Sequence, residues 1–212
     1  MNSAMNPAIQ KQDELIAGED WARADFYALL AQFYSGKVTD EFLARFRTME
    51  WDQLDRTSPL GFEFGELVRV VEQTDAKRIN QEFVDAFIGV GKPDVMLFGS
   101  YYIAGFLHEK PLVELRDDLD KLGLTRDDGM VETEDHIGFL MEVMRYLILE
   151  DSPPIPIADQ QAFFQKHIAP WYAKMTDAIE QSGNTDFFKT VGRLTHVFLD
   201  IETQSFDFES AV

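Results

Sequence analysis

Four polar residues gather within five positions of the chain: Glu132, Glu134, Asp135 and His136. Carboxylates and imidazoles ligate metal ions and transfer protons, so a metal site and acid–base catalysis are the first chemistries to consider. A ferritin-like di-metal site needs Glu-x-x-His on two helices. Here Glu132 and His136 lie four positions apart, no second copy is present, and the other three histidines lack a partner at ligand spacing. The pattern therefore disfavours metal catalysis, and a metal-dependent helical hydrolase remains an alternative.

No other stretch of the sequence carries a catalytic signature. The GxSxG, HExxH and GxGxxG patterns are absent, and Asp135-His136 reverses the His-Asp order of HD-type phosphohydrolases. The segment Gly89–Lys92 (GVGK) resembles part of a phosphate-binding loop, but it lacks the rest of GxxxxGK[ST] and follows an expected helix instead of a strand. A Ser/His/Asp triad has no sequence spacing of its own, and nothing in the chain points to one.

The element that must position the acidic cluster is Val131–Glu150, which is predicted to form one long helix. Apolar residues recur at three- and four-residue spacing over Ile137–Ile148, which indicates a helix with one buried face. Thr133 is the expected N-cap, with Glu134 and Asp135 in the first turn, where the positive end of the helix dipole favours carboxylates. This arrangement would hold a polar site at the tip of a buried helix.

The composition describes an acidic chain without cysteine. Of 212 residues, 38 are acidic and 19 basic, which gives a net charge of −19 without any run of Lys or Arg. Such a charge repels nucleic acid and attracts basic peptides. The lack of cysteine excludes disulfides, thiolate catalysis and Cys-held iron–sulfur clusters. The N-terminus lacks the apolar core of a signal peptide and Val95–Leu107 is too short to span a bilayer, so we expect a soluble cytoplasmic protein.

The remaining apolar periodicities predict an all-α protein of about nine or ten helices, with residues 1–212 forming a single globular domain. We expect residues 1–18 to be a flexible tail and residues 89–111, which mix Gly, Pro and aromatics, to be a long loop or hinge. Helix exchange through this hinge would give a domain-swapped dimer, so a monomer and such a dimer both remain open. The other expected helices are Asp20–Tyr34, Asp40–Met49, Leu60–Gln73, Asp75–Ile88, Pro111–Leu122, Gln160–His167 (capped by Asp159), Tyr172–Gln181 and Asp186–Glu202.

Five stretches share their order and spacing with a known protein family. Phe83–Phe87 comes first, followed by Leu97–Tyr102 (LFGSYY), an aromatic–Ser–aromatic segment after a proline-containing loop. Pro111–Leu124 matches the helix that follows this segment. Glu132–Phe139 (ETEDHIGF) matches a Glu…Asp-His signature, and Phe163–Trp171 matches a Phe…His-Leu-x-x-Trp element. Together these stretches, which cover most of the chain, resemble the TorD/DmsD/NarJ-like family of redox enzyme maturation chaperones.

The resemblance implies a cytoplasmic all-helical chaperone with no cofactor, catalytic residue or metal of its own. Such proteins bind the twin-arginine signal peptide or the apo form of a molybdenum-cofactor oxidoreductase, such as a DMSO/TMAO reductase-like precursor. They assist cofactor insertion and hold back export until maturation. Guanidiniums favour carboxylates in bidentate geometry, and the apolar part of a leader needs a groove. The residues expected at this site are Glu132, Glu134, Asp135 and His136, together with Leu97, Phe98, Ser100, Tyr101 and Tyr102.

The chain departs from the family pattern at Phe98, where the family often has Trp, and a second aromatic position carries Tyr102. Target preference is therefore expected to differ from that of other members. Two interpretations of His136 stay open: it orients Asp135 or donates to a peptide carbonyl, or it is a histidine hydrogen-bonded within the fold. An assembly subunit that acts on leaderless enzyme, as in the NarJ-like branch, is the main alternative function.

Overall fold

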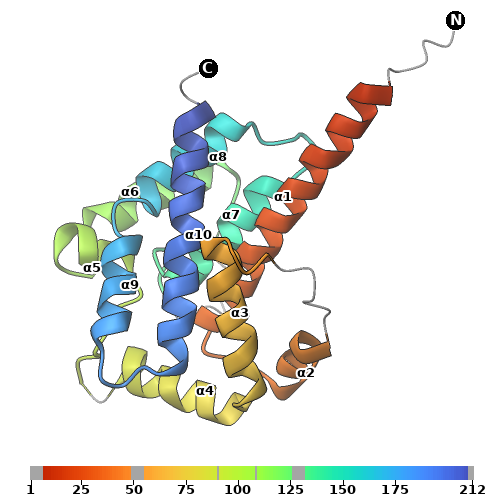
Figure 1. Ribbon diagram of the computed structural model, residues 1–212. Helices are drawn as coiled ribbons and strands as arrows, with labels where there is room; N and C mark the ends of the chain where they lie inside the picture. The colour runs from red at the N-terminus through yellow and green to blue at the C-terminus, as the bar shows by residue number, and fades with distance from the viewer. Residues whose placement is uncertain (1–6, 49–54, 90, 108, 126–131, 210–212) are drawn as a thin grey trace, which may run out of the picture.

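The computed structural model describes residues 7–48, 55–89, 91–107, 109–125 and 132–209, with side chains described within residues 18–208. These ranges contain ten α-helices, one π-helical turn and no extended strand, which confirms the predicted all-α class (Figure 1). None of the described helices is both long and apolar enough to cross a membrane. The elements are α1 (Pro7–Tyr34), α2 (Asp40–Thr48), α3 (Pro59–Glu72), α4 (Ala76–Phe83), the π-helical turn Val84–Ile88, α5 (Gly99–Ala104), α6 (Lys110–Lys121), α7 (Ile137–Leu149), α8 (Ile157–His167), α9 (Tyr172–Gln181) and α10 (Phe187–Glu209).

Helix α7 lies at the centre of the apolar core. It packs along α1, and Leu140, Met144 and Leu147 form its buried face at the predicted spacing. Helix α10 crosses in front of this pair and packs against α3 and α9 (Figure 1). The ring of Phe188 on α10 meets the ring of Phe87 edge-on at 5.0 Å between centroids, which ties α10 to the π-helical turn. Helices α1, α7 and α10 thus supply much of one continuous core.

Helix α7 begins later than predicted. Its first residue is Ile137 and its N-cap is His136, whose Nδ1 accepts the amide hydrogen of Gly138 at 3.1 Å. The expected cap at Thr133 is therefore wrong. Glu134 and Asp135 precede the helix because their carboxylates bind groups on α6 and α5 instead of the free amides of α7. Val131, the expected start, lies outside the described residues.

The expected loop at residues 89–111 contains a short helix, α5, which the sequence pattern did not indicate. Its six residues are too few for an apolar period, and it ends at Gly105, whose φ of 85° is easily adopted only by glycine. Helix α8 begins at Ile157 after Pro156, so Asp159 lies in its first turn instead of capping it. Helix α1 begins at Pro7 and so runs through much of the segment expected to be a tail.

One buried carboxylate joins the two longest helices. Glu202 of α10 is only 2% exposed. Its oxygens accept hydrogen bonds from Nε and Nη2 of Arg23, both at 2.9 Å, and from the hydroxyl of Tyr27 at 2.9 Å. Burial alone would lower the pKa of Arg23, but its hydrogen bonds to Glu202 raise that pKa above its usual value. Both partners lie on α1, so this network fixes α10 against α1.

Replacing Glu202 with Gln is expected to lower the free energy of unfolding by about 2 kcal/mol, because one amide N–H then faces the donors of Arg23. Urea unfolding measures this change through the transition midpoint at an unchanged slope. Glu66→Gln is the matched control: Glu66 pairs with Arg69 on the exposed surface of α3, where an ion pair contributes little. Equal losses in the two variants would contradict the role given to the buried network.

Candidate partner-binding site

The structure brings the two stretches that contain the predicted site residues side by side. Phe98 and His136 form an isolated antiparallel bridge. The amide of Gly99 donates to the carbonyl of Asp135 at 2.9 Å, and the amide of Ile137 donates to the carbonyl of Leu97 at 2.8 Å. The start of α5 is thereby hydrogen-bonded to the start of α7, although about 35 residues separate them in the sequence.

Asp135 is a buried carboxylate that holds α5 in place. Its Oδ2 accepts the backbone N–H of Ser100 at 2.8 Å, and its Oδ1 accepts the hydroxyl of Thr133 at 2.6 Å. The residue is 3% exposed. Asp135 thus supplies the capping group that α5 lacks locally, since Phe98 at the N-cap position has no side-chain acceptor. Asp135 and Ser100 line the same cavity.

Glu134 already binds a guanidinium from its own chain. Its two carboxylate oxygens accept from Nε and Nη2 of Arg116 at 3.0 and 2.8 Å, in the bidentate geometry expected for a guanidinium. Glu134 is buried and Arg116 on α6 is half-exposed. The hydrogen bond to Glu134 raises the pKa of Arg116. This pair fastens α6 to the segment before α7, and Glu132 is the exposed member of the acidic cluster.

His136 is enclosed by the fold. Besides capping α7, its ring meets the ring of Phe98 edge-on at 5.1 Å between centroids. Burial lowers the pKa of His136 from 6.5 to about 4, and the nearby charges of Glu132 and Asp135 offset this only in part. The ring is therefore neutral at pH 7, with Nδ1 as an acceptor. Of the two interpretations given to His136, the geometry favours a histidine hydrogen-bonded within the fold.

This burial predicts a pH dependence of stability. The folded pKa of His136 lies below the unfolded value, so on acidification the unfolded chain takes up the proton first and stability is lost between pH 6.5 and 4. Lowering the pH from 7 to 5 should cost about 2 kcal/mol through this residue. His136→Asn should remove that part of the slope, because Asn also caps helices but does not titrate. Urea unfolding of both proteins at the two pH values tests this, and parallel slopes would contradict it.

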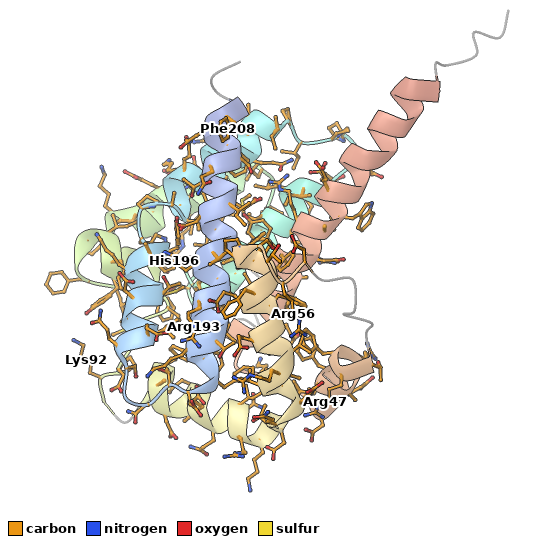
Figure 2. All side chains as sticks on the ribbon, viewed as in Figure 1. Arg47, Arg56, Lys92, Arg193, His196 and Phe208 are labelled. Atoms are coloured by element: carbon orange, nitrogen blue, oxygen red, sulfur yellow. The ribbon has the colours of Figure 1, made fainter. Side chains whose placement is uncertain are left out.

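The apolar and aromatic residues predicted to line a groove are buried or half-buried. Leu97 is buried in the core. Tyr102 donates its hydroxyl to the carbonyl of Met96 at 2.9 Å and stacks on Trp171 at 5.7 Å between ring centroids. Phe98 and Tyr101 are half-buried. The ammonium of Lys92, which Figure 2 shows at the lower edge of the molecule, lies 5.9 Å from the ring centroid of Tyr101.

This region also exposes a group of apolar side chains, which the sequence analysis did not predict. Four apolar side chains on α5, on α6 and in the turn between them are exposed to solvent, with Phe106 at 71%. We call this group the α5–α6 apolar patch: Ile103, Phe106, Leu107 and Val113. The α5–α6 pair lies at the outer edge of the molecule in Figure 1. The sequence signal was Phe106-Leu107 directly after Gly105, which indicates a turn with apolar residues at its tip. Exposed apolar groups gathered in this way mark interaction sites.

Comparison with known proteins identifies the family. The model of the nitrate reductase delta subunit family matches residues 55–177 of this chain. The chaperone protein TorD of Vibrio atlanticus is 24% identical over 200 residues, covering 86% of this chain and 93% of the relative. TorD of Vibrio cholerae is 22% identical over 202 residues, covering 87% and 92%. These relatives are named as chaperones and not as enzymes, which agrees with the predicted non-enzymatic chaperone role.

A solved structure shares the fold. It is described as a candidate redox enzyme maturation protein of Archaeoglobus fulgidus, and it superposes with a TM-score of 0.56 at 17% identity, over 84% of this chain and 93% of that one. Within the described residues, no group of three or more His, Asp or Glu side chains is placed to hold a metal ion. The resemblance found in the sequence is confirmed: the chain is similar to TorD chaperones and belongs to the nitrate reductase delta subunit family.

Proposed function

We propose that this protein is a cytoplasmic chaperone that binds the twin-arginine signal peptide, or the apo form, of a molybdenum-cofactor oxidoreductase. In this role it assists cofactor insertion and holds back export until maturation is complete. The names of its relatives support the chaperone role. The observation that carries peptide binding is the position of the α5–α6 apolar patch beside the carboxylates of Glu114 and Asp135, since Ile103 of the patch lines the same cavity as both.

A twin-arginine leader has the complementary pattern. It joins two guanidiniums to an apolar segment, so it needs carboxylates beside an exposed apolar surface. Large apolar side chains exposed together are uncommon on proteins without a partner. The net charge of −19 would draw a basic peptide toward the chain from a distance. The α5–α6 patch and the half-exposed carboxylate of Glu114 on α6 offer both features close together.

We assign different roles to the predicted site residues. Asp135 holds α5 against the start of α7 by accepting the backbone N–H of Ser100, and His136 caps α7, so these residues shape the site. The buried Leu97, the partly buried Tyr102 and the Arg116-bound Glu134 support the site from within. The exposed carboxylate of Glu132 and the half-buried rings of Phe98 and Tyr101 are accessible to a peptide.

Calorimetric titration with a synthetic twin-arginine leader peptide tests this function. Replacing both arginines of the peptide with lysine is expected to weaken binding about tenfold, because an ammonium cannot form bidentate pairs. Raising the salt concentration should also weaken binding, since charge attraction contributes. If neither a leader peptide nor a precursor carrying it binds the purified protein, leader recognition is wrong.

A second candidate function is assembly of a leaderless enzyme subunit. It is favoured by the description of the matching family model, which names a subunit of nitrate reductase. In this case the α5–α6 patch would contact the folded or partly folded enzyme instead of a leader. Binding of a leaderless molybdoenzyme, together with no heat change on titration with the leader peptide, would select this alternative.

A further inference from the structure

A small cavity with polar and apolar walls lies between α5, α6 and the corner where α8 meets α9. Its volume is about 110 Å³, and its polar wall is formed by Ser100, Glu114, Asp135, Lys166 and His167. The helices around it are in contact: α5 packs on α6 and α9, and α6 packs on α8. Since one water occupies about 30 Å³ of liquid, the cavity has room for a few waters or for one planar polar head group.

Ser100 lines this cavity and carries a hydroxyl that is not used in hydrogen bonding within the described residues. The residue is 1% exposed, and its Oγ is a buried atom that has no hydrogen-bond partner in the part of the chain that the structure describes. Its backbone N–H is already taken by Asp135, so only the hydroxyl is available. A buried hydroxyl left unpaired costs free energy, and such groups in folded proteins usually have a partner. A guest that hydrogen-bonds to this Oγ would remove that cost.

The charges around the cavity favour a cationic guest. Asp135 forms no ion pair within the described residues, because both of its oxygens accept from uncharged donors. Glu114 pairs with Lys110, whose side chain is 85% exposed, and an ion pair at such a site is weak and easily exchanged. The cation in the wall, Lys166, is bound to the carboxylate of Asp118 at 2.5 Å. Arg116 lies near enough to Asp135 for their charges to interact, but it hydrogen-bonds to Glu134 instead. The carboxylates of Glu114 and Asp135 are therefore the charges in the wall with which a cationic guest could pair.

The histidine in the wall does not change this balance. Burial lowers the pKa of His167, although its hydrogen bond to Asp118 acts in the opposite direction, so the ring is neutral at pH 7. Its Nε2 lies 2.9 Å from Asp118 Oδ2, which means that the same carboxylate holds both Lys166 and His167. Asp118 also binds Lys121 at 2.7 Å, so Lys166 and His167 belong to a network that is already paired, and Ser100 and Glu114 are left for a guest.

We propose that this cavity binds one guanidinium group of the client, with Glu114 exchanging the ammonium of Lys110 for it and Ser100 Oγ accepting one of its hydrogens. A guanidinium suits the cavity better than an ammonium because its donors point in several directions within one plane. Ile103 lines the cavity and belongs to the α5–α6 apolar patch, so one peptide segment can occupy both. That the guanidinium comes from a leader arginine rests on the proposed function.

The test uses two probes and three variants of the full chain. N-acetyl-L-arginine amide is titrated into the ¹⁵N-labelled protein, with the uncharged citrulline analogue as control, and the amide signals of Gly99 and Ser100 are followed. A twin-arginine leader peptide is titrated separately by calorimetry. Glu114→Gln removes the exchangeable carboxylate, and Ser100→Val fills the cavity. Glu66→Gln removes the same charge from an exposed ion pair on α3.

We expect saturable shifts with the arginine probe and none with citrulline. Affinity for both the probe and the leader should fall about tenfold in Glu114→Gln and should be unchanged in Glu66→Gln. Glu114 is half-exposed, so this variant should fold even if Ser100→Val does not. If the leader binds Glu114→Gln as tightly as the parent, the cavity assignment is wrong and the proposed function stands.

A different pair of results would support the cavity assignment and contradict the leader-binding function. Saturable binding of the arginine probe that is lost in Glu114→Gln, without any binding of the leader, would keep the cavity as a guanidinium site and contradict leader recognition. Equal shifts with arginine and citrulline would overturn the preference for a cation. Failure of both probes would overturn the cavity assignment and the leader-binding function together.

Discussion

Replacing Phe106 with Asp is expected to weaken client binding about hundredfold while leaving the melting temperature unchanged. The side chain of Phe106 is 71% exposed in the free protein, so its loss removes little packing within the fold. In a complex it would be the largest apolar anchor of the α5–α6 patch, and buried aromatic anchors carry much of the binding energy of an interface. An added carboxylate would also have to be desolvated against an apolar segment.

Phe208→Asp is the matched control for this prediction. Phe208 is 75% exposed near the end of α10, at the top of Figure 2 and away from the labelled Lys92. Both variants replace a phenylalanine of similar exposure and add the same negative charge. Calorimetry with the client or its leader peptide should show a loss for Phe106→Asp alone. If both variants bind like the parent, the α5–α6 patch is not the binding surface.

Replacing Trp171 with Ala is expected to lower the free energy of unfolding by about 4 kcal/mol, as for other large-to-small changes of buried aromatics. Trp171 is fully buried, its ring stacks on Tyr102, and its Nε1 donates to the carbonyl of His167 at 2.6 Å. It also fits closely against Gly99, where an added Cβ would come within 3.0 Å of Nε1. This one side chain therefore joins α5 to the corner between α8 and α9.

Trp171→Phe separates packing from hydrogen bonding. The smaller ring keeps most of the apolar contact but leaves the carbonyl of His167 without its donor, so we expect a loss of about 1–2 kcal/mol. Urea unfolding measures both variants. A loss below 1 kcal/mol for Trp171→Ala would contradict the anchoring role, because it would mean that α5 is held in place without this residue.

The helices could be predicted because their apolar residues repeat at helical spacing, as Leu140, Met144 and Leu147 do in α7. The residue at which α7 begins could not be predicted from the sequence. Thr133, Glu134 and Asp135 have the composition of a helix N-terminus, but Arg116 and the amide of Ser100 bind these carboxylates from other elements. Tertiary contacts thus outweighed the local capping preference, and no sequence pattern near residue 133 records them.

Only part of the candidate site could be predicted, because tertiary contacts decide the rest. Sequence patterns located the two stretches at Leu97–Tyr102 and Glu132–His136, which the fold brings together. They did not indicate that Asp135 and His136 are enclosed, because burial depends on α5, a helix too short to have a period. The position of Phe106 directly after Gly105 indicates a turn but not an exposed ring, since an aromatic residue in a chain with 18 Phe is usually part of the core.

The most direct test of the account is co-purification from the native cells grown anaerobically, with the parent chain, Phe106→Asp and Phe208→Asp as baits and mass spectrometry as the readout. The account predicts that the parent chain and Phe208→Asp recover an unprocessed molybdoenzyme precursor that still carries its twin-arginine leader. Phe106→Asp should recover little of it. Recovery of no molybdoenzyme with any bait, or equal recovery with all three, would contradict the central claim that the α5–α6 face binds a redox enzyme client.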